Sequence, residues 1–278
     1  MAMAHKALCV GINDYPIEGN DLNGCVNDAH AWADTLASKF QFARSDIVML
    51  TDSAATKRNI IDGIKKLLAS AKKGDVLVFT NSSHGTYVAD KDGDEELYDE
   101  AICPYDIDKN LIIDDELRGL FHDVPKGVHA AVISDSCFSG TVLRAAVDEN
   151  LPGLQTPDDR RVRFLNPALL GKSVLVNPFK AASKRRQKFP ESSMTAILLT
   201  GAADNEYSYD ALIDGQYHGA MTYAAIRAIN ESLQPLTYQQ LHTRTRNIVA
   251  RSGYPQHPQL EGRREDKRAL LFGMRASA

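Results

Sequence analysis

Two short polar stretches carry the residues of this sequence that are best suited to covalent chemistry. One is 81–85 (NSSHG), which contains His84, and the other is 134–140 (SDSCFSG), which contains Cys137. A cysteine thiolate is a strong nucleophile, and a nearby imidazole can take up its proton. A free cysteine is more often a small buried hydrophobe, but small polar neighbours at the end of a strand favour access to Cys137. We therefore interpret Cys137 as a candidate nucleophile and His84 as its acid/base partner.

The apolar runs before these stretches predict how the two residues come together. Residues 76–79 (VLVF) and 128–133 (VHAAVI) have the length and composition of buried parallel strands. The carboxyl ends of parallel strands open on one edge of a sheet, where α/β proteins place their ligand sites. Gly85 lacks a Cβ, so its N–H can approach a bound carbonyl oxygen as an oxyanion donor.

The rest of the chain alternates strand-like and helix-like segments. The expected strands are 6–12, 47–50, 76–79, 128–133, 195–200 and 268–272, and the expected helices are 25–40, 56–72, 114–121, 221–229 and 238–250. This alternation predicts an α/β fold in which helices flank a mainly parallel sheet of about six strands.

Two stretches depart from the alternation. Residues 90–108 are strongly acidic, and we expect a solvated loop or a cation site there. Residues 145–190 hold five prolines and a cationic cluster without a sustained period, which predicts a long exposed insertion. We expect one domain over 1–278, with a dyad-bearing part (6–144), this insertion (145–190) and a smaller carboxyl-terminal part (191–278).

Composition limits the partners and the compartment. The formal net charge of -4 gives no reason to expect nucleic acid, and four scattered cysteines do not form a disulfide framework. No apolar run approaches the roughly 20 residues that span a bilayer, and the start lacks the order of a signal peptide. We predict a cytoplasmic protein that associates with neither nucleic acid nor membrane.

Several motifs, in order, resemble the caspase-like cysteine peptidases, specifically their metacaspase and bacterial orthocaspase branch. Besides the two polar stretches, these motifs are 22–28 (LNGCVND), 98–101 (YDEA), 113–117 (IDDEL) and 258–262 (PQLEG). The resemblance implies a caspase-like fold and peptide-bond hydrolysis by a Cys137/His84 dyad. It also implies that the N–H groups of Gly85 and Cys137 hold the oxyanion.

The same resemblance implies substrates with Arg or Lys before the cleaved bond. The pocket residues would be Asp28, Ser82 and Asp135, with Cys25 alongside. Two carboxylates that converge on one pocket leave uncompensated charge unless a cation enters. The alternative is that Asp28 caps its helix and Asp135 forms an internal ion pair.

Calcium-responsive members of this family resemble the chain at Asp99, Asp114 and Asp115, which gives a candidate Ca²⁺ site. They carry a further carboxylate where this chain has Arg144. A cation at that position opposes Ca²⁺, which prefers six or more oxygen ligands. We therefore expect chemistry that needs no cofactor, with calcium dependence as the alternative.

The insertion offers residues that such an acidic pocket would accept. Self-cleavage after Arg161, Lys184, Arg185 or Arg186 is one interpretation, a plain solvated loop is another, and binding to an acidic surface is a third. The predicted partners are protein or peptide substrates, and we expect a monomer. The alternative function is an inactive interaction module whose cleft is blocked by Ser83, Phe138 or the insertion.

Overall fold

A six-stranded sheet forms the centre of the computed structural model, which describes residues 3–69, 71–89, 98–107, 110–137, 160–170, 195–203 and 206–273. The strand order is β12-β9-β7-β3-β1-β2. The strands are β1 (His5–Gly11), β2 (Ile47–Thr51), β3 (Val76–Ser82), β7 (His129–Asp135), β9 (Ile197–Thr200) and β12 (Gln259–Glu261). All neighbours pair in parallel except β12, which is antiparallel to β9. The predicted α/β fold with a mainly parallel sheet is confirmed.

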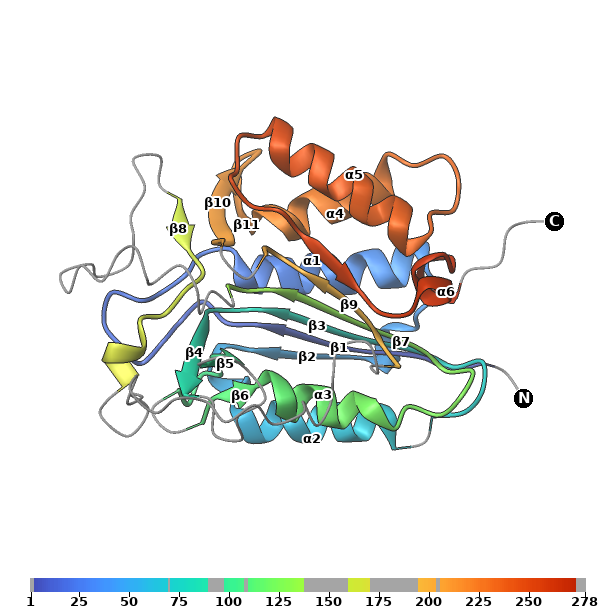
Figure 1. Cartoon of the computed structure of the whole chain (residues 1–278), viewed down its shortest axis with the longest axis horizontal. Coiled ribbons are helices and arrows are strands. Elements are labelled where there is room, and N and C mark those ends of the chain that lie inside the picture. Colours follow the sequence, from blue (N-terminus) through green and yellow to red (C-terminus); the bar gives the residue numbers. More distant parts are fainter. Residues whose placement is uncertain are drawn as a thin grey trace.

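Helices cover both faces of this sheet (Figure 1). One face carries α1 (Cys25–Lys39), α4 (Ala220–Asn230) and α5 (Tyr238–Arg251), and the other carries α2 (Lys57–Leu68) and α3 (Asp114–His122). All five predicted helices are therefore present, with ends shifted by a few residues.

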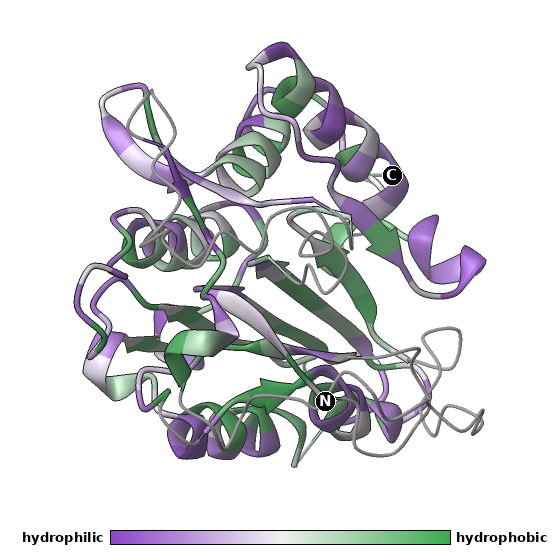
Figure 2. Ribbon diagram, turned by 60° about the vertical axis from the view of Figure 1, so that its left-hand side comes forward, coloured by the Kyte–Doolittle hydropathy of each residue, from purple (hydrophilic) through white to green (hydrophobic). Residues whose placement is uncertain are grey.

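The central strands are apolar on both sides because each side meets a layer of helices. In β1, Cys9 packs in the same apolar cluster as Trp32 of α1, whereas Leu8 belongs to the cluster that contains Ile60 of α2. Figure 2 shows apolar strands between helices with mixed polar and apolar surfaces. Thr56 caps the start of α2, where its side chain accepts a hydrogen bond from the Asn59 N–H.

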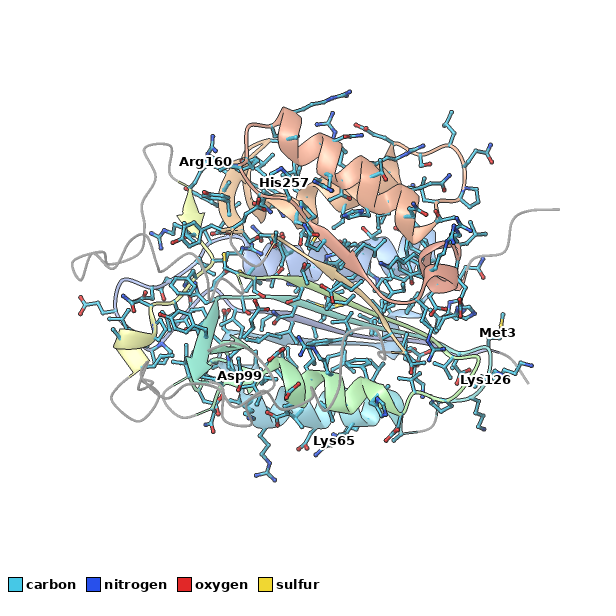
Figure 3. All side chains as sticks on the ribbon, in the orientation of Figure 1. Met3, Lys65, Asp99, Lys126, Arg160 and His257 are labelled. Carbon is cyan, nitrogen blue, oxygen red and sulfur yellow. The ribbon has the colours of Figure 1, made fainter. Side chains whose placement is uncertain are left out.

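Strand register brings the two polar stretches to one rim. In the parallel pair β3–β7, Ser82 lies opposite Asp135. His84 and Cys137 each follow that matched pair by two residues, at the carboxyl ends of their strands. Met3 and Lys126 mark the opposite end of the sheet (Figure 3).

Two small sheets at this rim are absent from the sequence prediction. One has the order β4-β5-β6 and the other β11-β10-β8. Their strands are β4 (Gly85–Ala89), β5 (Tyr98–Ile102), β6 (Ile112–Ile113), β8 (Arg161–Val162), β10 (Tyr209–Ile213) and β11 (Gln216–Gly219). The prediction that 90–108 is a loop or cation site rather than core is wrong for β5, because Ala101 and Ile102 are buried. Residues 90–97, 108 and 109 lie outside the described residues.

Two further expectations need correction. The predicted last strand at 268–272 is instead a turn: α6 (Arg264–Lys267) is followed by a 3-10 segment, Leu271–Gly273. The apolar character of this stretch comes from Phe272, whose buried ring packs edge-on against the rings of Phe40 and Tyr238. The insertion is not wholly exposed, since Arg163 and Leu165 are fully buried. The remainder, 145–159 and 171–190, lies outside the described residues.

Candidate active site

A buried arginine occupies an acidic pocket at the rim. The Arg163 Nη2 atom lies 2.7 Å from Asp28 Oδ2 and 3.0 Å from Asp210 Oδ1. Its Nη1 atom lies 3.0 Å from the backbone oxygen of Asp135 and 3.3 Å from Ser82 Oγ. The side chains of Arg163, Asp28 and Asp210 are all 0% exposed. The planar guanidinium therefore meets partners at both of its terminal nitrogens, a fit that suits arginine.

The pocket carboxylates are fixed by donors other than Arg163. Asp28 accepts hydrogen bonds from the Gly219 N–H at 3.0 Å and from Ser82 Oγ at 3.0 Å, and it lies 3.0 Å from Nδ1 of His218. The other donors are Thr222 N–H and Ser208 Oγ to Asp135, and Asn23 N–H and Gly24 N–H to Asp210. Burial raises the pKa of Asp28 even though Arg163 and His218 oppose that rise. The fold thus holds the carboxylates in place, and the Arg163 guanidinium supplies the countercharge that opposes the effect of burial on Asp28.

The backbone of Arg163 is held as firmly as its side chain. Its N–H donates to the Ser208 carbonyl oxygen at 2.9 Å. Its own carbonyl oxygen accepts from the N–H groups of Gly85 at 2.9 Å and Cys137 at 3.2 Å. A Cβ at position 85 would overlap the Cys137 carbonyl oxygen, which explains why this close approach needs glycine. Two converging N–H donors on one carbonyl oxygen are the geometry of an oxyanion hole.

The Cys137 thiol lies at the carboxyl end of β7, beside the same segment. It is 0% exposed, and its sulfur accepts a hydrogen bond from the Ser208 N–H at 2.7 Å. Burial raises the pKa of this thiol, and the Ser208 hydrogen bond only partly offsets that rise. With the Arg163 segment in place, the cysteine therefore rests as a neutral thiol.

The His84 ring is held in one tautomer. Its Nε2 atom lies 2.7 Å from the backbone oxygen of Asn20, and a carbonyl oxygen can only accept, so Nε2 carries the hydrogen. The Nδ1 atom is buried and has no hydrogen-bond partner among the described residues. Burial lowers the pKa of His84 to about 4, so the ring is neutral at pH 7. A neutral ring with a bare Nδ1 can act as a base.

The structure brings most of the sequence-predicted site residues together. Asp28, Ser82 and Asp135 all contact the Arg163 guanidinium, and Gly85 and Cys137 contact its carbonyl oxygen. The Cys25 thiol is fully buried, and burial raises its pKa while the charge of Arg163 lowers it. His84 directly precedes Gly85 in the chain.

Sequence reasoning missed Asp210, Asn20, Ser208 and the occupant Arg163 itself. It also did not single out His218, which contacts Asp28 in the pocket wall. The contributions of Asn20 and Ser208 come chiefly from backbone atoms, which no side-chain pattern encodes. Asp210 lies on an unpredicted hairpin strand, so no sequence signal connected it with Asp28.

The candidate calcium residues are arranged differently. Asp114 Oδ2 lies 2.5 Å from Arg118 Nη2, and Asp115 Oδ1 lies 3.4 Å from Arg118 Nη1. Asp99 is buried on β5. Within the described ranges, no group of three or more His, Cys, Asp or Glu side chains is placed to hold a metal ion. As placed, a guanidinium rather than a set of oxygen ligands faces Asp114 and Asp115, so these residues do not fit Ca²⁺.

Other basic residues in and beside the insertion either lie outside the pocket or fall outside the residues that the structure describes. Arg161 lies on β8, and its Nη1 atom donates to the Asp21 carbonyl oxygen. Arg144, Lys184, Arg185 and Arg186 lie outside the described residues.

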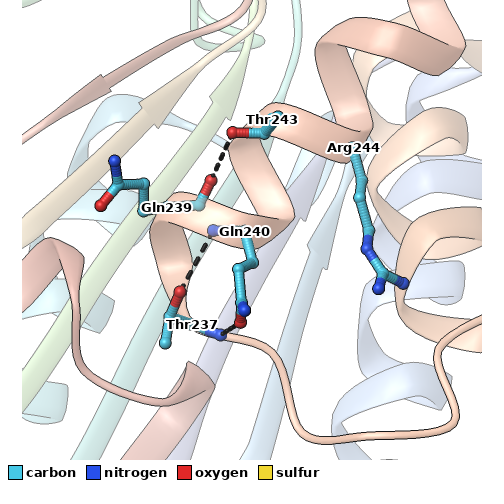
Figure 4. Close-up of a pocket in the computed structure, with 5 residues that line it drawn as sticks. All are labelled: Thr237, Gln239, Gln240, Thr243 and Arg244. Atoms are coloured by element: carbon cyan, nitrogen blue, oxygen red, sulfur yellow. Dashed lines mark hydrogen bonds between the residues drawn. The ribbon is translucent and has the colours of Figure 1, made fainter.

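A separate hollow at the start of α5 is lined by Thr237, Gln239, Gln240, Thr243 and Arg244 (Figure 4). Thr237 and Gln240 form a reciprocal capping box there. None of these residues contacts Arg163, and none carries a thiol or imidazole. This hollow therefore offers no group for covalent catalysis.

Comparison with known proteins agrees with this geometry. The metacaspase, peptidase C14 domain matches residues 5–146. Metacaspase-1A of Aspergillus fumigatus is 34% identical over 92% of this chain and 68% of its own length. Metacaspase-1 of Coccidioides immitis is 33% identical over 92% of this chain and 60% of its own length.

Solved structures share the architecture. A Geobacter sulfurreducens protein superposes with a TM-score of 0.69 and 27% identity, covering 97% of this chain and 98% of that chain. Caspase-1 of Spodoptera frugiperda superposes with a TM-score of 0.58 and 11% identity, covering 93% and 86%, which shows the fold alone.

The fold and the family together define a caspase-like cysteine peptidase. Within that class, the chain belongs to the metacaspase family. No helix in the described part of the chain is both long and apolar enough to cross a bilayer.

Proposed function

We propose that this metacaspase is an endopeptidase that cleaves after Arg or Lys, with Cys137 as nucleophile and His84 as general acid/base. We also propose that it cuts its own chain between Arg163 and Phe164. One observation carries both statements. The Arg163 guanidinium fills the acidic pocket while its carbonyl oxygen meets the N–H groups of Gly85 and Cys137. This arrangement supports the proposal because a substrate residue before the cleaved bond needs both a matching side-chain pocket and two N–H donors on its carbonyl oxygen.

In the acylation step, His84 takes the Cys137 proton and the sulfur attacks the carbonyl carbon of the bound arginine. The carbonyl oxygen becomes negative and is stabilised by the N–H groups of Gly85 and Cys137. The carbon–nitrogen bond then breaks as His84 returns the proton to the leaving amine. This leaves a thioester on Cys137 and a new amino terminus.

In the deacylation step, water replaces the leaving amine. His84 takes a proton from that water, whose oxygen attacks the thioester carbon. The carbon–sulfur bond then breaks, and the Cys137 thiolate takes the proton back from His84. Asn20 supports both steps because its carbonyl oxygen holds Nε2 as the donor and so leaves Nδ1 as the atom that exchanges protons. The Cys137 thiol supplies the nucleophile and the His84 imidazole supplies the proton transfers of these steps.

The pocket chemistry favours arginine over lysine. Nη2 of Arg163 contacts two carboxylates while Nη1 contacts Ser82 and the Asp135 carbonyl oxygen. A lysine ammonium is a point charge and meets fewer of these partners at once. We propose Arg163 as the self-cleavage site in place of Arg161, which lies two residues earlier and faces Asp21 instead.

The rival function is an inactive interaction module whose cleft is blocked by the insertion. The bound Arg163 segment is compatible with that function as well. Activity therefore has to be measured. We expect a peptide that carries Arg before a fluorogenic leaving group to be turned over, with kcat/KM about 10-fold above the Lys peptide. An Asp peptide should be inert, and Cys137→Ala should abolish turnover. No turnover of any peptide, with or without calcium, together with no alkylation of Cys137 by an iodoacetamide probe, would support the rival.

A further inference from the structure

The segment around Arg163 is bound on both sides of the bond that follows it. Before Arg163, β8 pairs antiparallel with β10, with Val162 opposite Tyr209. After Arg163, the chain changes partner: Phe164 forms a parallel bridge with Gly85, and the Leu165 N–H donates to the Gly85 carbonyl oxygen at 2.9 Å. The leaving side of the bond is therefore held by its own backbone contacts, on a different small sheet.

The side chain on the leaving side has an aromatic environment. The Phe164 ring stacks on the ring of Tyr87, with centroids 6.1 Å apart and an interplanar angle of 17°. It also lies 6.2 Å from the ring of Tyr207 at a tilt of 53°. Tyr87 belongs to β4 and Tyr207 directly precedes Ser208, so both rings come from segments that also hold Arg163. An aromatic side chain at this position gains two ring contacts that an aliphatic or charged one lacks.

The next residue enters an apolar pocket. Leu165 is 0% exposed and belongs to the cluster that contains Ile102 and Leu170. Its backbone is fixed as well, because Thr86 Oγ1 donates to the Leu165 carbonyl oxygen at 2.8 Å. An aliphatic side chain there removes apolar surface from water, whereas a charged one would be desolvated.

Three residues before Arg163, the chain is held only by half-exposed contacts. Arg160 lies over the ring of Tyr254 at 4.6 Å and donates to the Gly253 carbonyl oxygen at 3.2 Å, at the start of β8 (Figure 3). Both Arg160 and Tyr254 are only half-buried. Such contacts are weak in water, so little sequence preference is expected three residues before Arg163.

We propose that Tyr87 and Tyr207 form a binding site for an aromatic side chain directly after the cleaved bond, followed by a pocket for an aliphatic one. The substrate class is then polypeptides with the order Arg, aromatic, aliphatic. This inference rests on the proposed function, since it assigns the leaving side of the same cleft. It also requires that Phe164 and Leu165 vacate the cleft after the chain has cut itself.

The test uses the full chain after self-processing and internally quenched peptides that differ at one position. Each peptide carries Val-Arg before the bond and X-Leu after it, where X is Phe, Tyr, Ala or Glu. We expect kcat/KM for Phe and Tyr to exceed that for Ala by about 10-fold, and Glu to be the poorest.

Variants assign the preference to the two rings. Tyr87→Ala should reduce the Phe-to-Ala ratio to about 2-fold or less, and Tyr87→Phe, which keeps the ring, should retain it. Tyr207→Ala provides a second, independent variant and should reduce the ratio in the same direction.

The outcomes separate the two proposals. Efficient cleavage after Arg with equal rates for Phe and Ala overturns the aromatic site alone, and this is also the result expected if Phe164 and Leu165 stay in place. A ratio that survives both alanine variants overturns the assignment to Tyr87 and Tyr207. Failure to cut any peptide after Arg overturns the proposed function, and the aromatic site with it.

Discussion

Two arginines in this molecule sit among aspartates, and they do so in different ways. Arg118 contacts Asp114 and Asp115, which lie four and three residues before it on helix α3. Arg163 contacts Asp28 and Asp210, which lie 135 and 47 residues away in sequence. The Arg118 side chain keeps 9% exposure, whereas Arg163 has none.

This difference in sequence separation indicates different roles for the Arg118 and Arg163 clusters. On α3 the arginine and its aspartates lie three and four residues apart on one helix, so these charges pair locally. The pocket around Arg163 is built from separate elements, and each carboxylate is held by donors of its own. It is complete as an anionic cavity without its arginine. A cluster of that kind suits exchange of one guanidinium for another, as a substrate pocket requires.

The largest expected effect comes from removing the guanidinium of the pocket. Arg163→Gln should slow cutting after residue 163 by about 10⁴-fold, because the buried polar groups of the site lose their partner. In the Cys137→Ala background, which stays uncut, the same change should cost about 3–5 kcal/mol of unfolding free energy. Gel analysis over time and denaturant titration measure the two quantities.

The matched control is Arg118→Gln. It removes a cation that is also buried but is paired within its own helix, away from the pocket, so we expect a loss of up to about 3–5 kcal/mol of stability but normal self-cleavage. Equal losses of self-cleavage in the two variants would show that the clusters are not different in kind.

Lowering the pH should reduce the free energy of unfolding through protonation of His84. Its pKa in the folded chain is about 4, below the ordinary 6.5, so the unfolded chain binds the proton more tightly. The contribution is present above pH 6.5 and is lost as the pH falls toward 4, on the order of 3 kcal/mol in all. Titration of unfolding free energy should therefore show a steeper acid loss in Cys137→Ala than in Cys137→Ala with His84→Gln. Parallel curves would contradict a buried neutral imidazole.

A smaller effect is expected from Asp210→Asn. The amide can still accept from the N–H groups of Asn23 and Gly24 but no longer carries charge toward the guanidinium. We expect kcat/KM for an Arg peptide to fall between about 10- and 100-fold, the worth of one charge-assisted hydrogen bond. Asp115→Asn is the matched control on the helical cluster, and it should leave kcat/KM for the Arg peptide unchanged because Asp115 pairs with Arg118 and not with Arg163.

The sequence predicted the parts of the molecule that depend on local pattern. Apolar runs and helical spacing located the central strands and five helices, because burial between two layers imposes those patterns. Strand ends located the rim, and small polar neighbours drew attention to His84 and Cys137. The pairing of Asp114 and Asp115 with Arg118 also follows from helical spacing.

The features that the sequence did not predict depend on long-range contacts. Nothing local distinguishes Arg163 from Arg160 or Arg161, and only the converging pocket selects it. Asp210 joins the site through hairpin β10–β11, whose half-polar strands give a weak signal. The Asn20 carbonyl oxygen beside His84 and the Ser208 N–H beside Cys137 are backbone groups, so their roles come from the fold and not from residue type.

The most direct test of the central claim is to map where the purified chain cuts itself. Intact-mass measurement and amino-terminal sequencing of the incubated wild type should give a fragment that begins at Phe164, and Cys137→Ala should give none. A fragment that begins after Arg161, Lys184, Arg185 or Arg186 instead, or an uncut chain that nonetheless turns over Arg peptides, would contradict the assignment of Arg163 as the residue bound for cleavage.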